Sequence, residues 1–417
     1  MKICAIICEY NPLHYGHLTH IAESRLMSGA DAIMCIMAGN FCQRGEPTVV
    51  NKYVRARMAL DAGADIVVQI PTAYACSSAE TFALAGVKIA NSFNNVTHLS
   101  FGCETNNHEL LQDIAKFLYN EPKEYKDALQ KYMEEGNSIA TSREKALAEL
   151  IDNGIFKFSD KDEALDIIRK PNNILAIEYL KALYATNSSI QPLFSVRENS
   201  DYLSDVINGK DTSATAIRAK LYNTRSVRCV KRLLPKSSYK LLQDEIKMSG
   251  FVDDDLYDNI AMYKIKTTPL DDFKEIYGVS EGIENRFKDK STKIKDLKTL
   301  LLEVKTKRYT YTRLKRIVTC LVLNIKKNCV DELYKIKQLP YIKVLGFNNN
   351  NSALLNELNC NTNLIIRNSN IVENPSKLYK ELAAIEDNAN AVYNQLLTKI
   401  PAIPDYAPDL MTKTIVY

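Results

Sequence analysis

Three histidines spaced by three residues, His14, His17 and His20, are the side chains of this chain best suited to chemistry. Where a helix begins, residues three apart lie near one another on one face. Gly16 lets a phosphate or an adenine approach the backbone closely, and a helix N terminus offers N–H groups and a positive dipole end. His14 and His17 can therefore donate hydrogen bonds to the α-phosphate of a nucleotide as negative charge builds up during attack. These residues predict an ATP-using adenylyl-transfer site.

A metal centre is the main alternative for such a cluster, and a chance His-rich loop is another. No nearby cysteine or carboxylate completes a ligand set, so we expect no metal-ligating side chains. Triphosphate chemistry commonly uses Mg²⁺, so we expect Mg²⁺ to accompany ATP, although the sequence offers no carboxylate cluster to hold it. For His20, a surface position one turn further along the helix is an equal alternative to a place in the site.

The histidines follow the apolar segment Ile3–Cys8, which predicts a first strand, and they open a helix expected from Gly16 to Met27. Further runs rich in Ile and Val alternate with helical patterns. We expect strands at Ala32–Met37, Ile66–Ile70, His98–Phe101 and Pro192–Val196, and helices at Val54–Ala62, Ala79–Phe93 and Ile174–Tyr184. Such alternation is typical of an α/β fold with a Rossmann-like parallel sheet covered by helices on both faces. Ligands bind beyond the carboxyl ends of such strands, which is where the histidines lie.

Cationic residues follow the second expected strand. Arg44 lies between Gly39 and Gly45 at the carboxyl edge of the sheet, and Lys52 and Arg55 fall on the next helix. Their charges suit phosphate oxygens or the backbone of an acceptor RNA. A solvated surface position is the ordinary place for such side chains, and for Lys52 and Arg55 we weigh it equally with a functional role.

Two further segments suit nucleotide binding. The segment TSATAIR opens a helix with hydroxyl residues and places an arginine one turn later, which makes Ser213, Thr215 and Arg218 candidates for phosphate contacts. Helix capping is the competing explanation for Ser213. Gly102 ends the fourth expected strand and permits close approach of an adenine or a ribose, with an ordinary turn glycine as the alternative. Glu104 either holds a ribose hydroxyl or caps the next helix.

The length of 417 residues is too great for one ordinary core and indicates two domains, with three as the alternative. We place the boundary near Asn223, with an α/β catalytic domain at 1–223 and a mostly helical, Lys-rich domain at 224–417 that has a strand candidate at Tyr341–Leu345. No run of eighteen apolar residues occurs, so we expect no membrane span. Ten cysteines without a Cys-x-x-Cys pair favour free thiols in a reducing compartment, so we expect a cytoplasmic protein.

A basic stretch in the second domain suits nucleic acid. Between Arg286 and Lys343 there are seventeen Lys or Arg residues against five Asp or Glu residues. Basic side chains bind phosphates, and interleaved tyrosines can stack on unpaired bases, so we expect RNA contacts there. The RNA-binding candidates are Lys307, Arg308, Tyr309, Tyr311, Arg313 and Arg316, together with Arg44, Lys52 and Arg55. A solvated helix face is the alternative, because charge runs are commonly no more than that.

The segment EYNPLHYGH, residues 9–17, resembles the HIGH-type nucleotidylyltransferase superfamily. Three other segments, GNFCQRGEP at 39–47, PNNIL at 171–175 and KRYTYTRL at 307–314, are similar to a narrower group, the bacterial tRNA(Met) cytidine acetate ligase family. The resemblance implies that acetate attacks the α-phosphate of ATP, which gives acetyl-adenylate and pyrophosphate. It further implies that N4 of the wobble cytidine of elongator tRNA(Met) then takes the acetyl group, which releases AMP.

The resemblance also implies ATP contacts. It places them at Gly102, at Asn172, for which helix capping is the alternative, and at Arg197 at the end of the fifth expected strand. TSATAIR is similar to the second signature of the superfamily and departs from it at Thr212 and Ala214. The ATP-binding candidates are then Cys8, Glu9, Tyr10, Asn11, His14, Gly16, His17, His20, Gly102, Asn172, Arg197, Ser213, Thr215 and Arg218, with His14 and His17 as the catalytic pair.

Two other functions fit parts of the sequence. A nucleotidylyltransferase acting on a small phosphorylated acceptor would share the histidine chemistry, but it leaves the basic second domain without a role. A non-catalytic RNA-binding protein would have no need of His14, Gly16 and His17 together.

Overall fold

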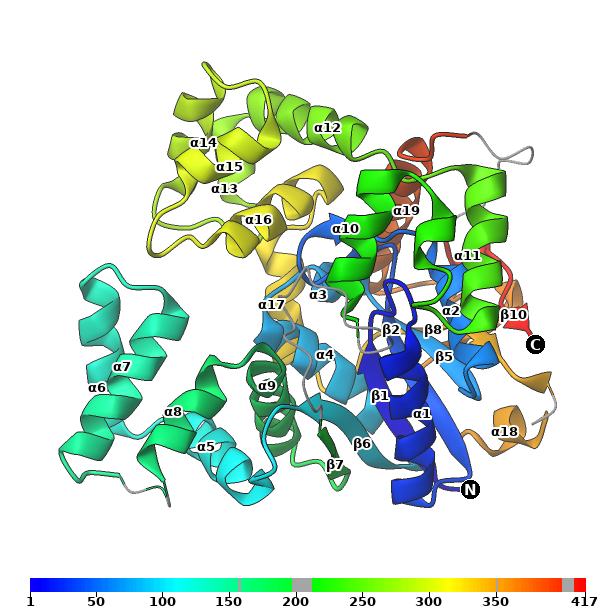
Figure 1. Ribbon diagram of the computed structural model, residues 1–417, viewed down its shortest axis with the longest axis horizontal. Coiled ribbons are helices and arrows are strands. Elements are labelled where there is room, and N and C mark those ends of the chain that lie inside the picture. Colours follow the sequence, from blue (N-terminus) through cyan, green and yellow to red (C-terminus); the bar gives the residue numbers. More distant parts are fainter. Residues whose placement is uncertain (157, 159, 197–211, 350–351, 400–408) are drawn as a thin grey trace.

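The computed structural model describes residues 1–156, 158, 160–196, 212–349, 352–399 and 409–417. At its centre lies a sheet of eight strands (Figure 1). The strands are β1 (Ile3–Cys8), β2 (Ala32–Ala38), β5 (Ile66–Ile70), β6 (Val96–Cys103), β7 (Gln191–Val196), β8 (Ile342–Phe347), β9 (Leu364–Ile365) and β10 (Ile415–Val416). The order along the main path is β10-β8-β5-β2-β1-β6-β7, and β9 pairs with β8.

The strands β5, β2, β1, β6 and β7 pair in parallel, which confirms the expected Rossmann-like α/β fold. Every residue of β1, β2 and β5 is buried, as expected for strands covered on both faces. Successive side chains of β1 point to opposite faces. Ile3 and Ile7 join the core shared with α4 (Ala79–Asn91) and α9 (Pro171–Ala185). Their neighbours in β1 join a second core, shared with α1 (Tyr15–Ser28) and α2 (Lys52–Asp61).

The other elements of the first half extend this unit. A short antiparallel hairpin, β3 (Phe41–Cys42) and β4 (Glu46–Pro47), follows β2, and the sequence patterns gave no expectation of it. The remaining helices are α3 (Thr72–Ala75), α5 (His108–Asn120), α6 (Lys123–Glu134), α7 (Ile139–Asp152), α8 (Lys161–Arg169) and α10 (Ala214–Thr224). Helices α5 to α8 form a lobe beside α9, at the lower left of Figure 1.

The second half is mostly helical. Its helices are α11 (Lys236–Ser249), α12 (Asp254–Thr267), α13 (Leu270–Lys274), α14 (Ile283–Ser291), α15 (Leu297–Val304), α16 (Tyr311–Leu323), α17 (Lys327–Lys335), α18 (Ser352–Glu357) and α19 (Lys377–Gln395). Short 3₁₀ helices within the described ranges include η1 (Val227–Val230), η3 (Asn368–Asn370) and η4 (Asp409–Met411). Helices α12 to α16 form a second lobe, at the upper left of Figure 1.

The boundary predicted near Asn223 does not end the sheet-containing unit. Strand β8 pairs antiparallel with β5, and β10 pairs with β8, so the second half completes the sheet begun by the first. Helix α11 also packs on α2. The exposed edge of β5 would otherwise present unpaired backbone groups, which explains why a distant strand covers it. No helix among the described residues is long and apolar enough to span a membrane.

Candidate active site

The loop between β1 and α1 holds the imidazoles of His14 and His17 so that the same ring nitrogen, Nδ1, accepts a hydrogen bond in each. His14 Nδ1 accepts a hydrogen bond from the backbone N–H of Gly16 at 3.1 Å, and His17 Nδ1 accepts one from the N–H of His14 at 3.4 Å. The rings stack with centroids 3.8 Å apart. Because Nδ1 accepts in both rings, the proton of each neutral imidazole lies on Nε2. The spacing of the two histidines therefore builds a reciprocal cap for α1 and sets both tautomers.

The backbone ahead of the histidines is in an unusual conformation. Tyr10 has φ of +50°, in the left-handed region that side chains other than glycine seldom adopt. Its buried ring lies 4.9 Å from the ring of His17, and its hydroxyl is 3.5 Å from Cys35 Sγ. Burial, followed by the neighbouring Cys35, raises the pKa of Tyr10 well above its ordinary value, so the phenol stays neutral. The packing of this neutral ring holds the strained turn that presents the histidines.

A cavity of about 520 Å³ opens beyond the carboxyl ends of β1, β6 and β7, the position expected for a ligand in such a sheet. It is lined by thirteen of the predicted ATP-binding residues: Cys8, Glu9, Tyr10, Asn11, His14, Gly16, His17, His20, Gly102, Asn172, Ser213, Thr215 and Arg218. The predicted contact at Arg197 lies outside the described residues. Segments more than two hundred residues apart in the chain thus meet around one ligand-sized space.

The cavity is also lined by residues that the sequence patterns did not single out, among them Thr19, Glu23, Gln43, Phe101, Leu175, Tyr179 and Ser195. The sequence pattern could have indicated one of these residues, Glu23. Glu23 lies three residues after His20 on the same helix, so its position on the histidine face follows from helical spacing. Ser195 stands near the carboxyl end of β7, where a polar residue faces the ligand region.

The start of α10 brings three predicted residues to the cavity. Ser213 accepts a hydrogen bond from Ala216 N at 3.2 Å, so it caps the helix as well as lining the cavity. Arg218 Nη1 donates to the backbone oxygen of Asn11 at 3.0 Å, and Nη2 lies 3.3 Å from Thr215 Oγ1. A guanidinium at this place joins α10 to the loop that carries the histidines.

The two asparagines at the start of α9 have different partners. Asn172 donates from both its backbone N–H and Nδ2 to Glu104 Oε1, and Asn173 Oδ1 accepts from Glu104 N at 2.7 Å. Glu104 therefore anchors the N terminus of α9. The expectation that it caps the next helix is wrong, because Asn107 caps α5. A contact to a ribose hydroxyl stays a prediction. Asn172 lines the cavity, whereas Asn173 does not.

His20 is buried and faces inward, not on the surface that was its alternative position. Its Nε2 lies 2.9 Å from Ser100 Oγ, and Ser24 Oγ lies 2.7 Å from the same hydroxyl. This bond ties α1 to β6 at the rim of the cavity. His20 thus lines the site while it also fastens the helix that carries the catalytic pair.

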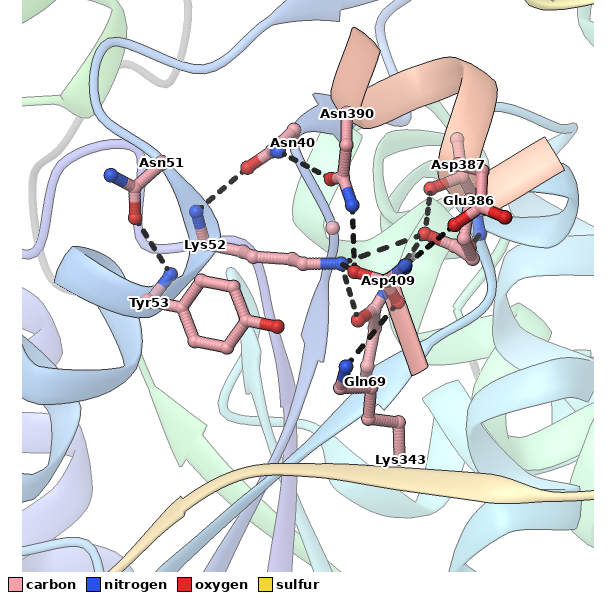
Figure 2. A network of polar contacts seen from close by, with 12 residues as sticks. Asn40, Asn51, Lys52, Tyr53, Gln69, Lys343, Glu386, Asp387, Asn390 and Asp409 are labelled. Atoms are coloured by element: carbon pink, nitrogen blue, oxygen red, sulfur yellow. Dashed lines mark hydrogen bonds and ion pairs between the residues drawn. The ribbon is translucent and has the colours of Figure 1, made fainter. Parts of the chain in front are cut away.

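The prediction that Lys52 and Arg55 contact RNA is wrong, because neither side chain has any exposed surface. Lys52 Nζ donates to Gln69 Oε1 at 3.0 Å and pairs with Asp409, and Glu386 Oε2 lies 3.8 Å away (Figure 2). Arg55 donates to the backbone oxygens at the ends of β1 and β2. The physical reason is that α2 packs between the sheet and α11, so both cations point into protein.

The predicted RNA contacts near α16 divide into buried and accessible side chains. Tyr309 is only 4 % exposed, and its hydroxyl lies 2.8 Å from Ser280 Oγ, so the prediction that it stacks on a base is wrong in this arrangement. Thr310 caps α16, which explains part of the Tyr-Thr pattern as local structure. Arg313 covers the Tyr309 ring at 4.0 Å, a cation–π contact. Lys307 is exposed, and Arg308, Tyr311, Arg313 and Arg316 are half-buried.

Two of these cations, Arg308 and Arg313, already bind protein groups, and Arg313 donates to the backbone oxygen of Arg308 and to Ser280 Oγ. Arg308 donates to the backbone oxygen of Met133 at 2.6 Å and pairs with Glu281 at 3.0 Å, so it bridges the two helical lobes. Burial lowers the pKa of Arg316. Arg44, the remaining candidate, lines the nucleotide-sized cavity, where its charge lies near the site of the histidines.

The donor set of the cavity does not fit a metal ion held by protein. Glu9 Oε1 accepts from Gln43 N at 2.7 Å, and Glu23 Oε2 accepts from Ser195 Oγ at 3.0 Å. Among the described residues, no three His, Cys, Asp or Glu side chains gather as a metal site. The expectation that Mg²⁺ accompanies ATP stays a prediction. All ten cysteines are free thiols, as predicted.

The sequence matches the model of the HIGH nucleotidyl transferase family over residues 1–404. It is 37 % identical over 409 residues to the tRNA(Met) cytidine acetate ligase of Clostridium perfringens, covering 97 % of this chain and 98 % of that protein. The fold matches the crystal structure of apo Thermotoga maritima TmcAL with a TM-score of 0.90 and 28 % identity, over 100 % of this chain and 99 % of that one. A second form of that protein, bound with alpha-thio ATP, matches with a TM-score of 0.86 and 29 % identity over 96 % of each chain. The chain therefore belongs to the HIGH nucleotidyl transferase family and, within it, to the tRNA(Met) cytidine acetate ligases.

Proposed function

We propose that this protein uses ATP to activate acetate as acetyl-adenylate and then acetylates N4 of the wobble cytidine of elongator tRNA(Met). The observation that carries the proposal is the cavity at the strand ends, which His14, His17 and Arg218 line together, and in which Nδ1 of each imidazole accepts a backbone hydrogen bond so that Nε2 can donate. The names of the relatives support the acceptor.

In the first step, a carboxylate oxygen of acetate attacks the α-phosphorus of ATP and the bond to the bridging oxygen of pyrophosphate breaks. Negative charge grows on the α-phosphate oxygens during this exchange. Nε2–H of His14 and of His17 donates to these oxygens, and the N termini of α1 and α10 add backbone N–H groups. The protein supplies position and charge and forms no covalent bond itself.

In the second step, the exocyclic amine of cytidine attacks the acetyl carbonyl carbon and AMP leaves with the electron pair of the broken bond. The amine loses one proton, and the product is N4-acetylcytidine. Such an attack needs the base out of its stack, which an anticodon loop permits at small cost. Lys307, Arg308, Tyr311, Arg313 and Arg316 supply the charge and stacking surface proposed for the RNA.

The test is an acetylation assay with the intact protein, carbon-labelled acetate, ATP and elongator tRNA(Met). After nuclease digestion, label is expected in N4-acetylcytidine and only when ATP is present. A tRNA with uridine at the wobble position is the matched control and should stay unlabelled. ATP-dependent label transfer to a small phosphorylated acceptor, or tRNA binding with no acetate-dependent pyrophosphate release, would contradict the proposal.

A further inference from the structure

One carboxylate on the β3–β4 hairpin stands between cations from two distant parts of the chain. Glu46 Oε1 lies 3.0 Å from Arg218 Nη2, and Oε2 lies 2.8 Å from Lys315 Nζ. Arg218 belongs to α10 and lines the nucleotide cavity, whereas Lys315 belongs to the basic helix α16. The side chains are 23 %, 13 % and 27 % exposed for Glu46, Arg218 and Lys315, so water screens these pairs only in part.

Glu46, Arg218 and Lys315 form a charge triad, in which the pKa of Glu46 depends on both cations and the pKa of Arg218 depends on Glu46. Burial by itself raises the pKa of Glu46, but Lys315 and Arg218 outweigh it and hold the pKa below its ordinary value. For Arg218, burial lowers the pKa, and Glu46 is the leading opposing influence that keeps it raised. One anionic group is therefore shared by two cations: Arg218, which lines the nucleotide cavity, and Lys315, which lies on α16 among the residues proposed to bind RNA.

The hairpin that carries Glu46 is seated on both neighbours. Gly45 has φ of +71°, and a Cβ there would lie 2.6 Å from the backbone nitrogen of Arg316, so the turn rests directly on α16. On the other side, Asn11 Nδ2 donates to Cys42 Sγ at 3.3 Å and Asn11 Oδ1 accepts from Val49 N at 2.9 Å. Asn11 opens the turn that leads to the histidines, so the hairpin joins α16 to the catalytic loop.

We propose that Glu46 is a positioning residue that makes nucleotide phosphate at Arg218 and RNA phosphate at Lys315 antagonistic. The proposal rests on the proposed function, which supplies both ligands. A triphosphate draws Arg218 away from Glu46, and the carboxylate then holds Lys315 more strongly against an RNA phosphate. Departure of pyrophosphate removes most of the negative charge, Arg218 returns to Glu46, and Lys315 becomes available. The geometry thus favours tRNA engagement after acetyl-adenylate has formed.

Coupling free energies of this kind commonly correspond to changes in affinity of about 5- to 150-fold, and a partly exposed triad belongs at the lower end. We expect tRNA(Met) to bind the wild-type protein about 5- to 10-fold more weakly when a non-hydrolysable ATP analogue with an α,β-methylene bridge is bound. A stable sulfamoyl analogue of acetyl-adenylate should lack this effect. By reciprocity, tRNA should weaken binding of the methylene analogue by the same factor.

The discriminating variants are Glu46→Gln and Lys315→Gln, each measured by fluorescence titration of tRNA(Met) with and without the methylene analogue. Either substitution should bring the ratio of the two dissociation constants close to one, because the shared carboxylate or its partner is gone. Simple repulsion between ATP and RNA would leave the ratio unchanged in Glu46→Gln. Thermal melting reports whether each variant is folded, and Glu332→Gln on the exposed face of α17 is the matched control that should keep the wild-type ratio.

An unchanged ratio in both folded variants, or tighter tRNA binding with the methylene analogue in the wild type, would overturn the proposal. If the wild type acetylates tRNA while the ratio is one, only the antagonism fails and the proposed function stands. If the wild type neither binds nor acetylates tRNA(Met), the proposed function fails and this inference fails with it.

Discussion

Replacing Lys52 by methionine tests the burial of this cation, which its sequence context did not reveal. The ammonium lies in a network of buried charges with Asp409 and Glu386 (Figure 2). Burial alone would raise the pKa of Asp409, but Lys52, Lys343 and a hydrogen bond from Asn390 hold the pKa below its ordinary value. Removing one partner of a buried ion pair costs about 3–5 kcal/mol, because the other charge stays buried without compensation.

The expected fall in melting temperature follows from the size of the chain. An unfolding entropy of about 2.1 cal/mol/K per residue gives about 0.9 kcal/mol/K for 417 residues, so a cost of about 3–5 kcal/mol lowers Tm by about 3–6 °C. Differential scanning calorimetry of the wild type and Lys52→Met measures this shift. The double variant Lys52→Met with Asp409→Asn should lose less than the sum of the two single variants, because the orphaned carboxylate is neutral.

A matched control is Lys335→Met, which removes an exposed lysine paired with Glu332 at 2.8 Å. Its Tm should hardly change, since surface pairs contribute little. The folded Lys52→Met protein at 25 °C should also bind tRNA(Met) as the wild type does. An unchanged Tm together with tenfold weaker tRNA binding would refute the burial argument and restore Lys52 as an RNA contact.

Three further outcomes follow from the geometry. His17→Ala should slow acetate-dependent exchange between ATP and pyrophosphate by about 10²–10³-fold, as expected for one lost donor to a developing charge, while His98→Ala at a distance from the cavity should not. Gly45→Ala should lower Tm more than Gly136→Ala, because both have positive φ but only Gly45 meets the backbone of α16; equal losses would contradict this. Burial lowers the pKa of Lys343 from its ordinary value of 10.5 to about 8. Between these two pH values, the unfolded chain holds more of the proton on this lysine than the folded chain does. The free energy of unfolding therefore increases as the pH rises through this window. The urea midpoint of the wild type should therefore rise relative to that of Lys343→Met between pH 8 and 10.5, and a constant difference would be contrary evidence.

Much of the catalytic half could be predicted from local sequence. Strands β1 and β5 have the bounds expected from their apolar runs, and the start of α1 follows from the glycine and the histidines that cap it. Such features depend on residues a few positions apart, whose spacing sets the backbone geometry directly. The position of the cavity also follows, because parallel strands place their carboxyl ends at one edge of a sheet.

Tertiary structure alone decided which charged and aromatic side chains are accessible. Lys52 is buried against Asp409, which lies 357 residues later in the chain. Tyr309 is buried where its hydroxyl donates a hydrogen bond to the backbone oxygen of Ser280. Strand β8 joins the sheet next to β5 because the edge of a parallel sheet accepts a partner from any part of the chain. The place of Glu46 between Arg218 and Lys315 likewise depends on how the β3–β4 hairpin, α10 and α16 meet. The spacing of residue types along the chain determines the local backbone structure. Whether a charged side chain is buried depends on partner residues that lie far away in the sequence.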